Sequence, residues 1–308
     1  MGTANRLRCR RSPRISRQKS PGRRPRPSTY RYACPRWIME IILLASGSSG
    51  NCALIRAGHG SERTTLILDA GIAMRTARDL ASQADCNLAF VDGVLLTHAH
   101  SDHCAKVVPL AARAKAPLWA HPDSLSPRSA ASPKEIARRS VVHKPFESGQ
   151  AFQVGSIQVT PVLLNHDAHP THGFLFEADG EKAGFFTDTG TAEALTPDLL
   201  HGMDFLVLES NHDPDMLRNG RYPPFLQERV RGDLGHLSNQ QAADVLSEAA
   251  PNTLRRLILA HLSERNNTSE LALQCSMTAL RSRGMTLMPE VAPKRGVLRV
   301  SSELPIEL

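Results

Sequence analysis

Three histidines and an aspartate stand close together in the segment Thr97-His98-Ala99-His100-Ser101-Asp102-His103, directly after an apolar run. Alternate side chains of an extended segment point the same way, so His98 and His100 can face one metal ion. Asp102 and His103, in the turn that follows, can face a second ion beside it. Imidazole suits zinc, iron and manganese, and a carboxylate adds affinity for harder ions. A merely solvated histidine-rich loop is the alternative, but it would not require four metal-binding side chains in this order.

Four more candidate residues follow strand-like runs elsewhere in the chain. Asp69 comes after residues 65–68, His166 after 157–164, Asp188 after 183–187 and His261 after 257–260. The carboxyl ends of strands are where open α/β sheets hold ligands. We therefore expect these side chains to converge on the same edge of the fold as the histidine segment.

This order of motifs resembles that of the metallo-β-lactamase-fold hydrolases, whose α/β fold is an αββα sandwich of two mixed β-sheets flanked by helices. The resemblance implies two divalent metal ions per chain, Mn²⁺ or Zn²⁺, and it assigns their ligands. His98, His100 and His166 would hold one ion, Asp102, His103 and His261 the other, and Asp188 would bridge both. Asp69 would shape the ligand loop without binding metal. Two such ions can activate a water at neutral pH and clamp a phosphoryl or carbonyl oxygen, so the implied chemistry is hydrolysis.

Beyond these ligands, the segment Gly235-His236-Leu237-Ser238-Asn239 leads into a helix. A helix N-terminus favours anions, and Ser238 or Asn239 can cap this one, so both are candidate substrate contacts. We expect His236 to contact a phosphate and to protonate the leaving group. The alternative is that His236 only packs on the start of the helix.

Smaller motifs of the chain add a similarity to one family within this superfamily. Nine short segments are together similar to the YycJ/WalJ-type exonucleases of this fold, over about residues 40 to 300. These segments are residues 44–51, 97–103, 188–190, 209–213, 216–217, 220–223, 235–239, 260–263 and 266–267. The similarity implies a cytoplasmic, manganese-favouring nuclease that degrades duplex DNA from the 5′ end, with Asp102, Asp188 and His236 as catalytic residues. Glu209 would support the ligands without binding metal. One departure is Cys104-Ala105-Lys106-Val107, which lacks the glycine common in this family.

A basic and aromatic segment lies between these motifs. It contains Arg218, Arg221, Arg229 and Arg231, with Tyr222 and Phe225 among them. Arginines beside aromatic rings suit phosphates and unstacked bases, and Arg221 is the candidate substrate contact. Ser48 and Asn51 are two more, because the loop at residues 46–51 presents hydroxyl groups and glycine amides after a strand. The alternatives are an ordinary exposed connection for the arginines and a plain tight turn for the loop.

The preferred function is hydrolysis of a phosphodiester bond, with a nucleic acid as the partner and no obligatory protein partner. A ribonuclease or a cyclic-nucleotide phosphodiesterase would share every ligand. A thioesterase or lactonase is disfavoured by residues 235–239 and by the arginines. A non-catalytic binding protein that relies on its basic N-terminal segment is disfavoured by the intact set of seven ligands.

The basic charge of the chain comes from its first 38 residues. They hold twelve of the 37 Lys and Arg residues and none of the 30 Asp and Glu residues, which leaves the other 270 residues with a formal charge of −5. This Arg-, Ser- and Pro-rich leader has no hydrophobic period, so we predict that it is disordered. Three interpretations of this leader remain open: a nucleic-acid-binding arm, a transit peptide, or an extension upstream of a true start codon at Met39.

Residues 39–308 are predicted to form the catalytic domain. They contain no apolar stretch of about 18 residues, which argues against a membrane helix. The six cysteines of the chain are scattered and form no CxxC pair. This pattern argues against a disulfide framework and favours a reducing cytoplasm.

Short apolar runs alternate with helical patterns in this domain, which predicts a mixed α/β fold. Strands are expected at residues 41–45, 52–57, 65–68, 91–97, 157–164, 174–178, 183–187, 205–209, 257–260 and 297–300. Helices are expected at residues 76–83, 106–115, 237–249 and 268–284. The nearly continuous apolar character of residues 205–209 is typical of a strand covered on both faces. Residues 124–140 are expected to form a loop with a helical turn.

Overall fold

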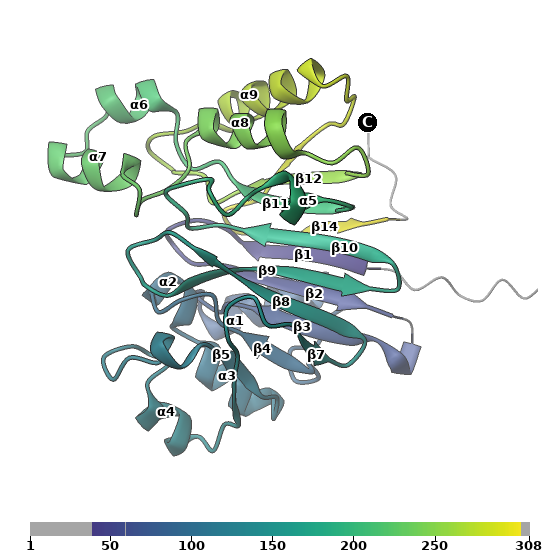
Figure 1. The fold of residues 1–308 in the computed structure, drawn as a ribbon. Coiled ribbons are helices and arrows are strands. Elements are labelled where there is room, and N and C mark those ends of the chain that lie inside the picture. The colour runs from purple at the N-terminus through teal and green to yellow at the C-terminus, as the bar shows by residue number, and fades with distance from the viewer. Residues whose placement is uncertain (1–38, 59, 303–308) are drawn as a thin grey trace, which may run out of the picture. The chain divides into compact units, whose positions relative to one another are not determined.

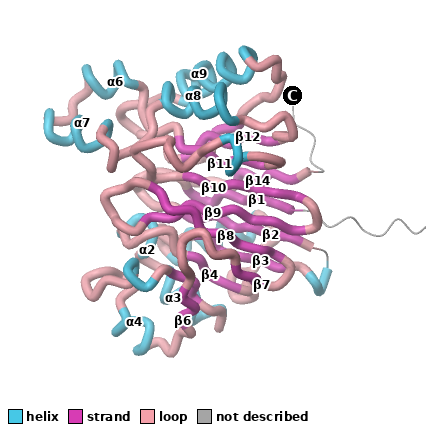
Figure 2. Tube along the Cα trace, in the orientation of Figure 1, coloured by secondary structure: helices cyan, strands magenta, loops and turns pink. Residues whose placement is uncertain are grey.

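The computed structural model describes residues 39–58 and 60–302, so the predictions made for the leader lie outside the described residues. Within these ranges, no helix is long and apolar enough to cross a membrane. The described chain forms four layers, with helices on the outer faces of two sheets that pack against each other (Figure 1). Figure 2 separates the strands of the two inner layers from the helices around them.

The first sheet has seven strands in the order β14-β1-β2-β3-β4-β5-β6. Their bounds are β1 (Met39–Ala45), β2 (Cys52–Ala57), β3 (Thr64–Leu68), β4 (Gly93–Leu95), β5 (Leu118–Ala120), β6 (His143–Pro145) and β14 (Leu298–Ser301). Strands from β14 to β3 pair antiparallel, and strands from β3 to β6 pair parallel. The sheet is therefore mixed.

The second sheet repeats this pattern in the order β13-β12-β11-β10-β9-β8-β7. Its strands are β7 (Phe152–Val154), β8 (Ile157–Leu164), β9 (Thr171–Ala178), β10 (Glu181–Phe186), β11 (Phe205–Glu209), β12 (Arg256–Ala260) and β13 (Glu290–Val291). Strands from β7 to β10 pair antiparallel, and strands from β10 to β13 pair parallel. Two mixed sheets flanked by helices confirm the predicted αββα class.

The helices divide between the two outer faces. The first half contributes α1 (Met74–Gln83), α2 (Ser101–Cys104), α3 (Val107–Ala114), α4 (Pro133–Arg138) and the 3₁₀ turns η1 (Gly60–Glu62) and η2 (Pro122–Ser124). The second half contributes α5 (Pro197–Leu200), α6 (Pro214–Asn219), α7 (Pro224–Arg231), α8 (Asn239–Ala249) and α9 (Ser269–Ser282). In Figure 1, α1 and α3 lie beside the first sheet, and α8 and α9 lie over the second.

The core has three apolar layers because each sheet is covered on both faces. Strand β1 contributes to two of them: Ile41 and Leu43 pack between the sheets, and Ile42 and Leu44 pack against the helices of the first half. Successive side chains of a strand point to opposite faces. A strand that is apolar at every position therefore fits a sheet buried on both sides.

Most predicted elements are confirmed, and the differences have local causes. The strands at residues 52–57, 157–164 and 205–209 have their predicted bounds. Strand β4 is shorter than the predicted 91–97, because the backbone N–H of Thr97 donates to the Asp69 carboxylate instead of to a strand. A one-turn helix, α2, replaces the predicted turn at Asp102 and His103.

The elements that the sequence patterns miss are short or little buried. They include the edge strands β6, β7 and β13, the three-residue strand β5 and the helices α5, α6 and α7. Helix α7 has no buried residue at all. Without a buried stripe there is no hydrophobic period from which such a helix can be predicted.

Candidate metal centre and active site

Three histidines from two loops come together at one edge of the sheets. His98 lies just beyond β4, His100 is the N-cap residue of α2, and His166 lies just beyond β8. Their ligand atoms all lie within 4.8 Å of one another. The structure therefore brings together the three residues that the family resemblance assigns to one ion.

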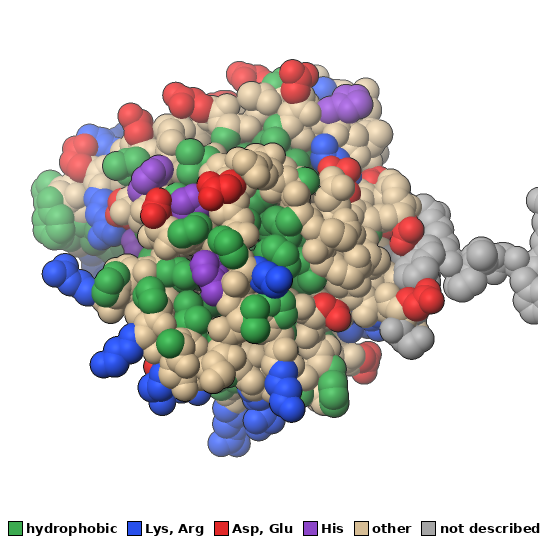
Figure 3. Space-filling model, turned by 60° about the horizontal axis from the view of Figure 1, so that its bottom comes forward, with side chains coloured by type: hydrophobic (Ala, Val, Ile, Leu, Met, Phe, Trp, Pro, Cys, Tyr) green, Lys and Arg blue, Asp and Glu red, His purple; other side chains and the backbone are tan. Residues whose placement is uncertain are grey.

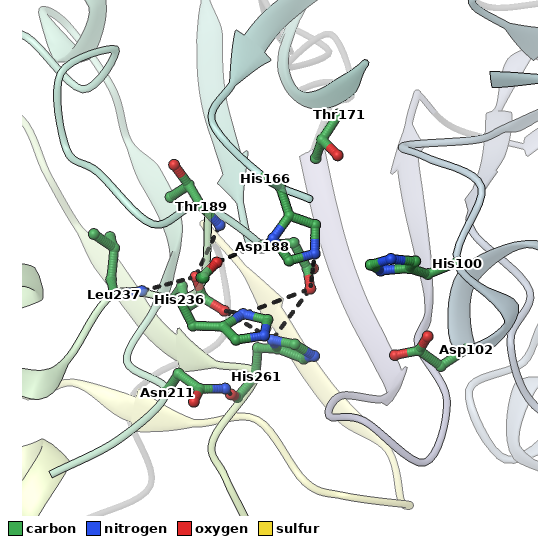
Figure 4. Close-up of polar contacts among 12 residues, drawn as sticks. His100, Asp102, His166, Thr171, Asp188, Thr189, Asn211, His236, Leu237 and His261 are labelled. Atoms are coloured by element: carbon green, nitrogen blue, oxygen red, sulfur yellow. Dashed lines mark hydrogen bonds and ion pairs between the residues drawn. The ribbon is translucent and has the colours of Figure 1, made fainter. Parts of the chain in front are cut away.

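The residues assigned to the second ion form an adjoining group. Ligand atoms of Asp102, His103 and His261 also lie within 4.8 Å of one another. Asp188 forms a further group with His98 and His103, one histidine from each set. In Figure 4, His100 and Asp102 face His166, Asp188 and His261 across the space between them. Asp188 thus lies close to a histidine of each assigned set.

The hydrogen bonds of these histidines leave one ring nitrogen of each directed inward. Nδ1 of His98 donates to Thr97 Oγ1 at 2.9 Å, and Nδ1 of His166 donates to the Gly235 carbonyl at 3.0 Å. His261 donates from Nδ1 to Glu209 Oε1 at 2.8 Å. A ring that donates through one nitrogen presents a lone pair at the other, as in the orienting bonds of metal-binding histidines.

The free atoms are the ones a metal ion would need. Among the described residues, Nε2 of His98, His166 and His261 and Oδ2 of Asp188 are buried and lack a hydrogen-bond partner. Buried polar atoms without partners are rare, and a cluster of them calls for a common explanation. Neutral imidazoles and a carboxylate are the donor set of divalent transition metals, so the residues fit the ions that the family implies.

Asp69 supports this centre from the end of β3. Its Oδ1 accepts the Thr97 backbone N–H at 2.9 Å, and its Oδ2 accepts the Thr97 hydroxyl at 2.8 Å and His103 Nδ1 at 2.7 Å. The carboxylate thereby fixes the start of the histidine segment and the ring of one ligand. Both of its oxygens are used in these bonds, in agreement with the expectation that Asp69 does not bind metal.

Glu209 plays the corresponding part at the end of β11. It is fully buried, and its Oε1 lies 2.9 Å from His236 Nδ1 and 2.8 Å from His261 Nδ1. Its Oε2 accepts the backbone N–H groups of Thr189 at 3.0 Å and Leu237 at 3.2 Å. Figure 4 shows these four partners converging on one carboxylate. One side chain therefore orients both a candidate ligand and the candidate acid.

Three of these residues have unusual backbone conformations. Asp69, Asp188 and His261 have φ of 58°, 62° and 58°, in the left-handed region that non-glycine residues rarely adopt. Each follows a strand of the two sheets, β3, β10 or β12. Such conformations persist where the surrounding contacts hold them, and they cluster at functional sites.

The charges of the centre are set by burial and by neighbouring groups. Burial lowers the pKa of His98, which favours the neutral ring that binds metal. Burial opposes ionisation of Asp188, but the rings of His261 and His103 hold the pKa of its carboxyl well below its usual range. Burial likewise opposes a charged His236, yet Glu209 raises the pKa of that ring to about 9.

A pocket of about 290 Å³ opens over this centre. Its lining includes Ser48, His100, Asp102, His166, Asp188, His236 and His261, and also Leu226, Arg229 and Val230 of α7. His236 therefore has access to a ligand in the pocket, while its Nδ1 is held by Glu209. Ser48, one of the predicted substrate contacts, is among the residues that line the pocket.

One acidic residue of this pocket has no role in the sequence-based assignment. Asp167, next to His166, lies 3.2 Å from His100 Nε2 through Oδ1 and 2.6 Å from Arg229 through Oδ2. It therefore joins a candidate ligand to α7, and it leaves Nδ1 of His100 for the ion. The motif Asn165-His166-Asp167 is visible in the sequence, but nothing there indicates that Arg229 lies opposite it.

Three predicted substrate contacts are corrected by their burial. The side-chain amide of Asn51 bonds both backbone groups of Gly47, and its Nδ2 lies 2.8 Å from His103 Nε2, so it holds a loop against a ligand. Ser238 caps α8 in a reciprocal capping box with Gln241. Asn239 is 0% exposed, with its amide bonded to Ser210 and Asn267. These side chains support the centre and offer no surface to a substrate.

The four arginines of the basic segment have separate environments. Arg218 pairs with Asp215 and Arg231 with Glu228, each within its own helix. Arg229 alone lines the pocket of the metal centre, and Arg221 lines a different pocket beside α6. Two of the four arginines are therefore paired locally, and the other two line different pockets.

A four-layer αββα fold with a histidine- and aspartate-rich centre at the ends of its strands defines the class of metallo-hydrolases. Residues 64–262 match the family model described as the beta-lactamase superfamily domain. The chain belongs to this superfamily, and it is a metal-dependent hydrolase.

Individual relatives agree with this assignment. The chain is 31% identical to the exodeoxyribonuclease YycJ of Bacillus anthracis over 246 residues, which cover 80% of this chain and 90% of that protein. It is also 31% identical to the exodeoxyribonuclease WalJ of Streptococcus pneumoniae serotype 2 over 234 residues, 76% of this chain and 85% of that one. The solved metallo-β-lactamase-fold protein YhfI of Bacillus subtilis superposes with a TM-score of 0.60 at 16% identity, covering 84% and 99% of the two chains.

Proposed function

We propose that this protein is a nuclease that hydrolyses the phosphodiester bonds of duplex DNA from a 5′ end. The observation that carries the proposal is the pocket in which Asp188 lies between two ligand groups, with His236 on its wall. Support for DNA as the substrate comes from relatives named exodeoxyribonucleases at 31% identity over most of both chains. Four free cysteines among the described residues are in keeping with a reducing cytoplasm as the place of action.

We assign two divalent ions, Mn²⁺ or Zn²⁺, to the centre. His98, His100 and His166 would hold one, Asp102, His103 and His261 the other, and Asp188 would contact both. Two such ions supply an activated water at neutral pH and stabilise the charge that develops on a phosphoryl group. The protein orients their ligands through Thr97, Asp69, Glu209 and the Gly235 carbonyl.

The other residues of the pocket bind the substrate and move a proton. Glu209 holds His236 through Nδ1, so Nε2 is the nitrogen that can give a proton to the leaving oxygen. Arg229 and Ser48 line the same pocket and can donate hydrogen bonds to phosphate oxygens. Asp167 holds Arg229 beside the centre and so places its charge before substrate arrives.

The shape and charge of the surface favour an end of a strand as the substrate. A pocket of about 290 Å³ with α7 along one wall has room for a terminal phosphate and its sugar, and not for the width of a duplex. On the face drawn in Figure 3, Lys and Arg side chains gather mainly along the lower border, and Asp and Glu along the upper border. Local charge of this kind matters more to a polyanion than net charge does.

Replacing Asp188 by Ala should abolish hydrolysis, because the carboxylate that would contact both ions is lost. The purified protein, loaded with manganese, would be given 5′- and 3′-labelled duplex DNA, single-stranded DNA and RNA. We expect metal-dependent loss from the 5′ ends of duplex DNA, with Asp188→Ala inactive. A fully metallated protein that cleaves no nucleic acid would contradict the proposal and leave only the hydrolase class.

Replacing His236 by Ala tests its role separately from the ligands. We expect metal content to stay the same and turnover to fall by about 10²- to 10⁴-fold, the usual contribution of a positioned acid. Metal content would be measured by elemental analysis of the dialysed protein, and turnover on the same labelled DNA. Loss of metal along with activity would show that His236 is a ligand or a support.

A further inference from the structure

A second pocket lies apart from the metal centre, between α6 and the loop that follows β12. It has a volume of about 630 Å³ and is lined by Met216, Asn219, Gly220, Arg221 and Arg265. None of these residues lines the pocket over the metal centre. Among the residues that the structure describes, no acid forms an ion pair with Arg221 or Arg265, so both guanidinium groups are available to a ligand.

Behind this pocket lies a polar side chain that also lacks partners. Asn266 is 1% exposed, and within the described ranges neither its Oδ1 nor its Nδ2 has a hydrogen-bond partner. The Oδ1 of Asn266 would lie 2.8 Å from a Cβ built on Gly220. Only glycine therefore allows the backbone at position 220 to lie this close to the Asn266 side chain. A buried amide is normally satisfied. Its position behind two free guanidinium groups indicates a place arranged for a polar ligand.

An aromatic ring positions one of the two arginines. The guanidinium carbon of Arg265 lies 5.9 Å from the centre of the Tyr222 ring. This stacking restrains the guanidinium plane while its N–H edge stays free to donate. Paired N–H groups of this kind match the oxygens of a phosphate.

Hydrogen bonds and a short stretch of chain connect this pocket to the metal centre. Asn211 Nδ2 donates to the His261 carbonyl at 2.8 Å, and the Asp213 N–H donates to the Asn266 carbonyl at 2.8 Å. Arg265 comes four positions after His261 in the chain, so their Cα atoms are at most about 14 Å apart. One strand of DNA carries a phosphate every ~3.4 Å along its axis, so the second pocket lies within a few nucleotides of the first.

We propose that the Arg221–Arg265 pocket binds backbone phosphates of the substrate strand, a few nucleotides from the bond that is cleaved. This inference rests on the proposed nuclease function and extends it to a second contact. Phosphate contacts carry no sequence information, so the pocket sets affinity and length preference and does not select bases.

The double variant Arg221→Ala/Arg265→Ala tests the pocket in the full metal-loaded chain. Fluorescence anisotropy with a labelled duplex of about 20 base pairs should show the Kd rising on the order of tenfold or more. The slope of log Kd against log salt should fall by about two, because two phosphate contacts are lost. In cleavage assays the rise in KM should be large for the long duplex and smaller for a dinucleotide, which cannot span both pockets.

Arg218→Ala is the control, since it removes one positive charge from α6, the helix that directly precedes Arg221. Arg218 lies outside the pocket and pairs with Asp215. We expect its Kd to stay within about twofold of the unchanged protein. An equal loss of affinity in Arg218→Ala, or an unchanged Kd in the double variant, would overturn the inference and leave only diffuse electrostatic attraction.

The binding assay separates this inference from the proposed function. If the unchanged protein cleaves DNA and the double variant binds DNA equally well, the proposed nuclease function stands and the proposed role of the pocket is refuted. If the unchanged protein binds DNA through these two arginines but cleaves none, the proposed nuclease function is refuted and the proposed role of the pocket stands. Inorganic phosphate as competitor adds a check, because millimolar phosphate should weaken binding by the unchanged protein more than by the double variant.

Discussion

Four histidines of the centre are oriented through Nδ1 by three kinds of acceptor. His98 bonds a hydroxyl, His103 and His261 bond carboxylates, and His166 bonds a backbone carbonyl. These four rings turn Nε2 inward, whereas His100 contacts Asp167 through its Nε2. Such supporting bonds fix the tautomer and raise the basicity of the ligand, which is why their loss commonly costs metal affinity.

Glu209 is the supporting residue whose replacement should matter most. Glu209→Gln keeps the volume but removes the negative charge facing His236 and His261, and its amide cannot accept all four hydrogen bonds that the carboxylate accepts. We expect metal affinity to fall by about 10- to 100-fold. Competition with a chromogenic chelator would measure it.

The control for this substitution is Glu177→Gln, on the exposed side of β9. It makes the same chemical change at a position away from the centre, so we expect no change in metal affinity. Equal affinities of Glu209→Gln and the unchanged protein would contradict the role given to Glu209.

At the scale of elements, the helix α2 depends on backbone contacts with two neighbouring loops. The Asn51 N–H donates to the Asp102 carbonyl at 2.7 Å, and the Ala70 N–H donates to the His103 carbonyl at 2.8 Å. A helix of four residues has little stability of its own, so these contacts hold two candidate ligands in place. A close approach of this kind leaves no room for a side chain at Gly71.

Gly71→Ala tests the approach directly. A Cβ at this position would lie 1.5 Å from the Asp102 carbonyl oxygen, so the loop and α2 must separate. We expect a loss of stability of about 1–3 kcal/mol from overpacking, measured by urea unfolding, together with weaker binding of the second metal ion. Gly180→Ala is the comparison, because its Cβ meets nothing within 4 Å and adds only left-handed strain, about 1 kcal/mol. A stable Gly71→Ala protein with full metal content would contradict this account of α2.

At the scale of the whole molecule, the centre joins the two halves of the described chain. His98, His100, Asp102 and His103 follow strands of the first sheet, and His166, Asp188 and His261 follow strands of the second. Without ions, the junction contains several buried polar atoms that lack partners among the described residues. Ions that contact ligands from both sheets should therefore stabilise the packing of one sheet on the other.

Removal of metal should accordingly lower the thermal stability of the protein. Binding to the native state alone at a free metal concentration 100 times the Kd contributes about 2.7 kcal/mol, so we expect a clear drop in Tm after chelation. Differential scanning calorimetry with and without chelator would measure it. Asp188→Ala should show a much smaller metal-dependent shift, and an unchanged Tm in the native chain would contradict the coupling of the two halves.

The fold class and the seven candidate ligands could be predicted before the structure was known, from local motifs and from the family resemblance that these motifs carry. Their spacing is local: the histidine segment is continuous, and the other ligands directly follow apolar strands. Such patterns can be recognised in the sequence without tertiary information, because strand ends in this class of fold converge on one edge of the sheets. The same holds for strands β2, β8 and β11, whose bounds follow from apolar runs and turn residues.

Only the tertiary structure decided how the supporting residues are used. Asn51, Ser238 and Asn239 resemble surface residues in the sequence, but packing turns them inward. Arg221 and Arg229 are eight positions apart and line different pockets, because Arg221 lies just after α6 and Arg229 lies within α7. The contacts of Glu209 span 20 to 52 residues of sequence, and no local pattern encodes such distances. Burial and long-range hydrogen bonds assign these roles, and both exist only once the sheets have packed.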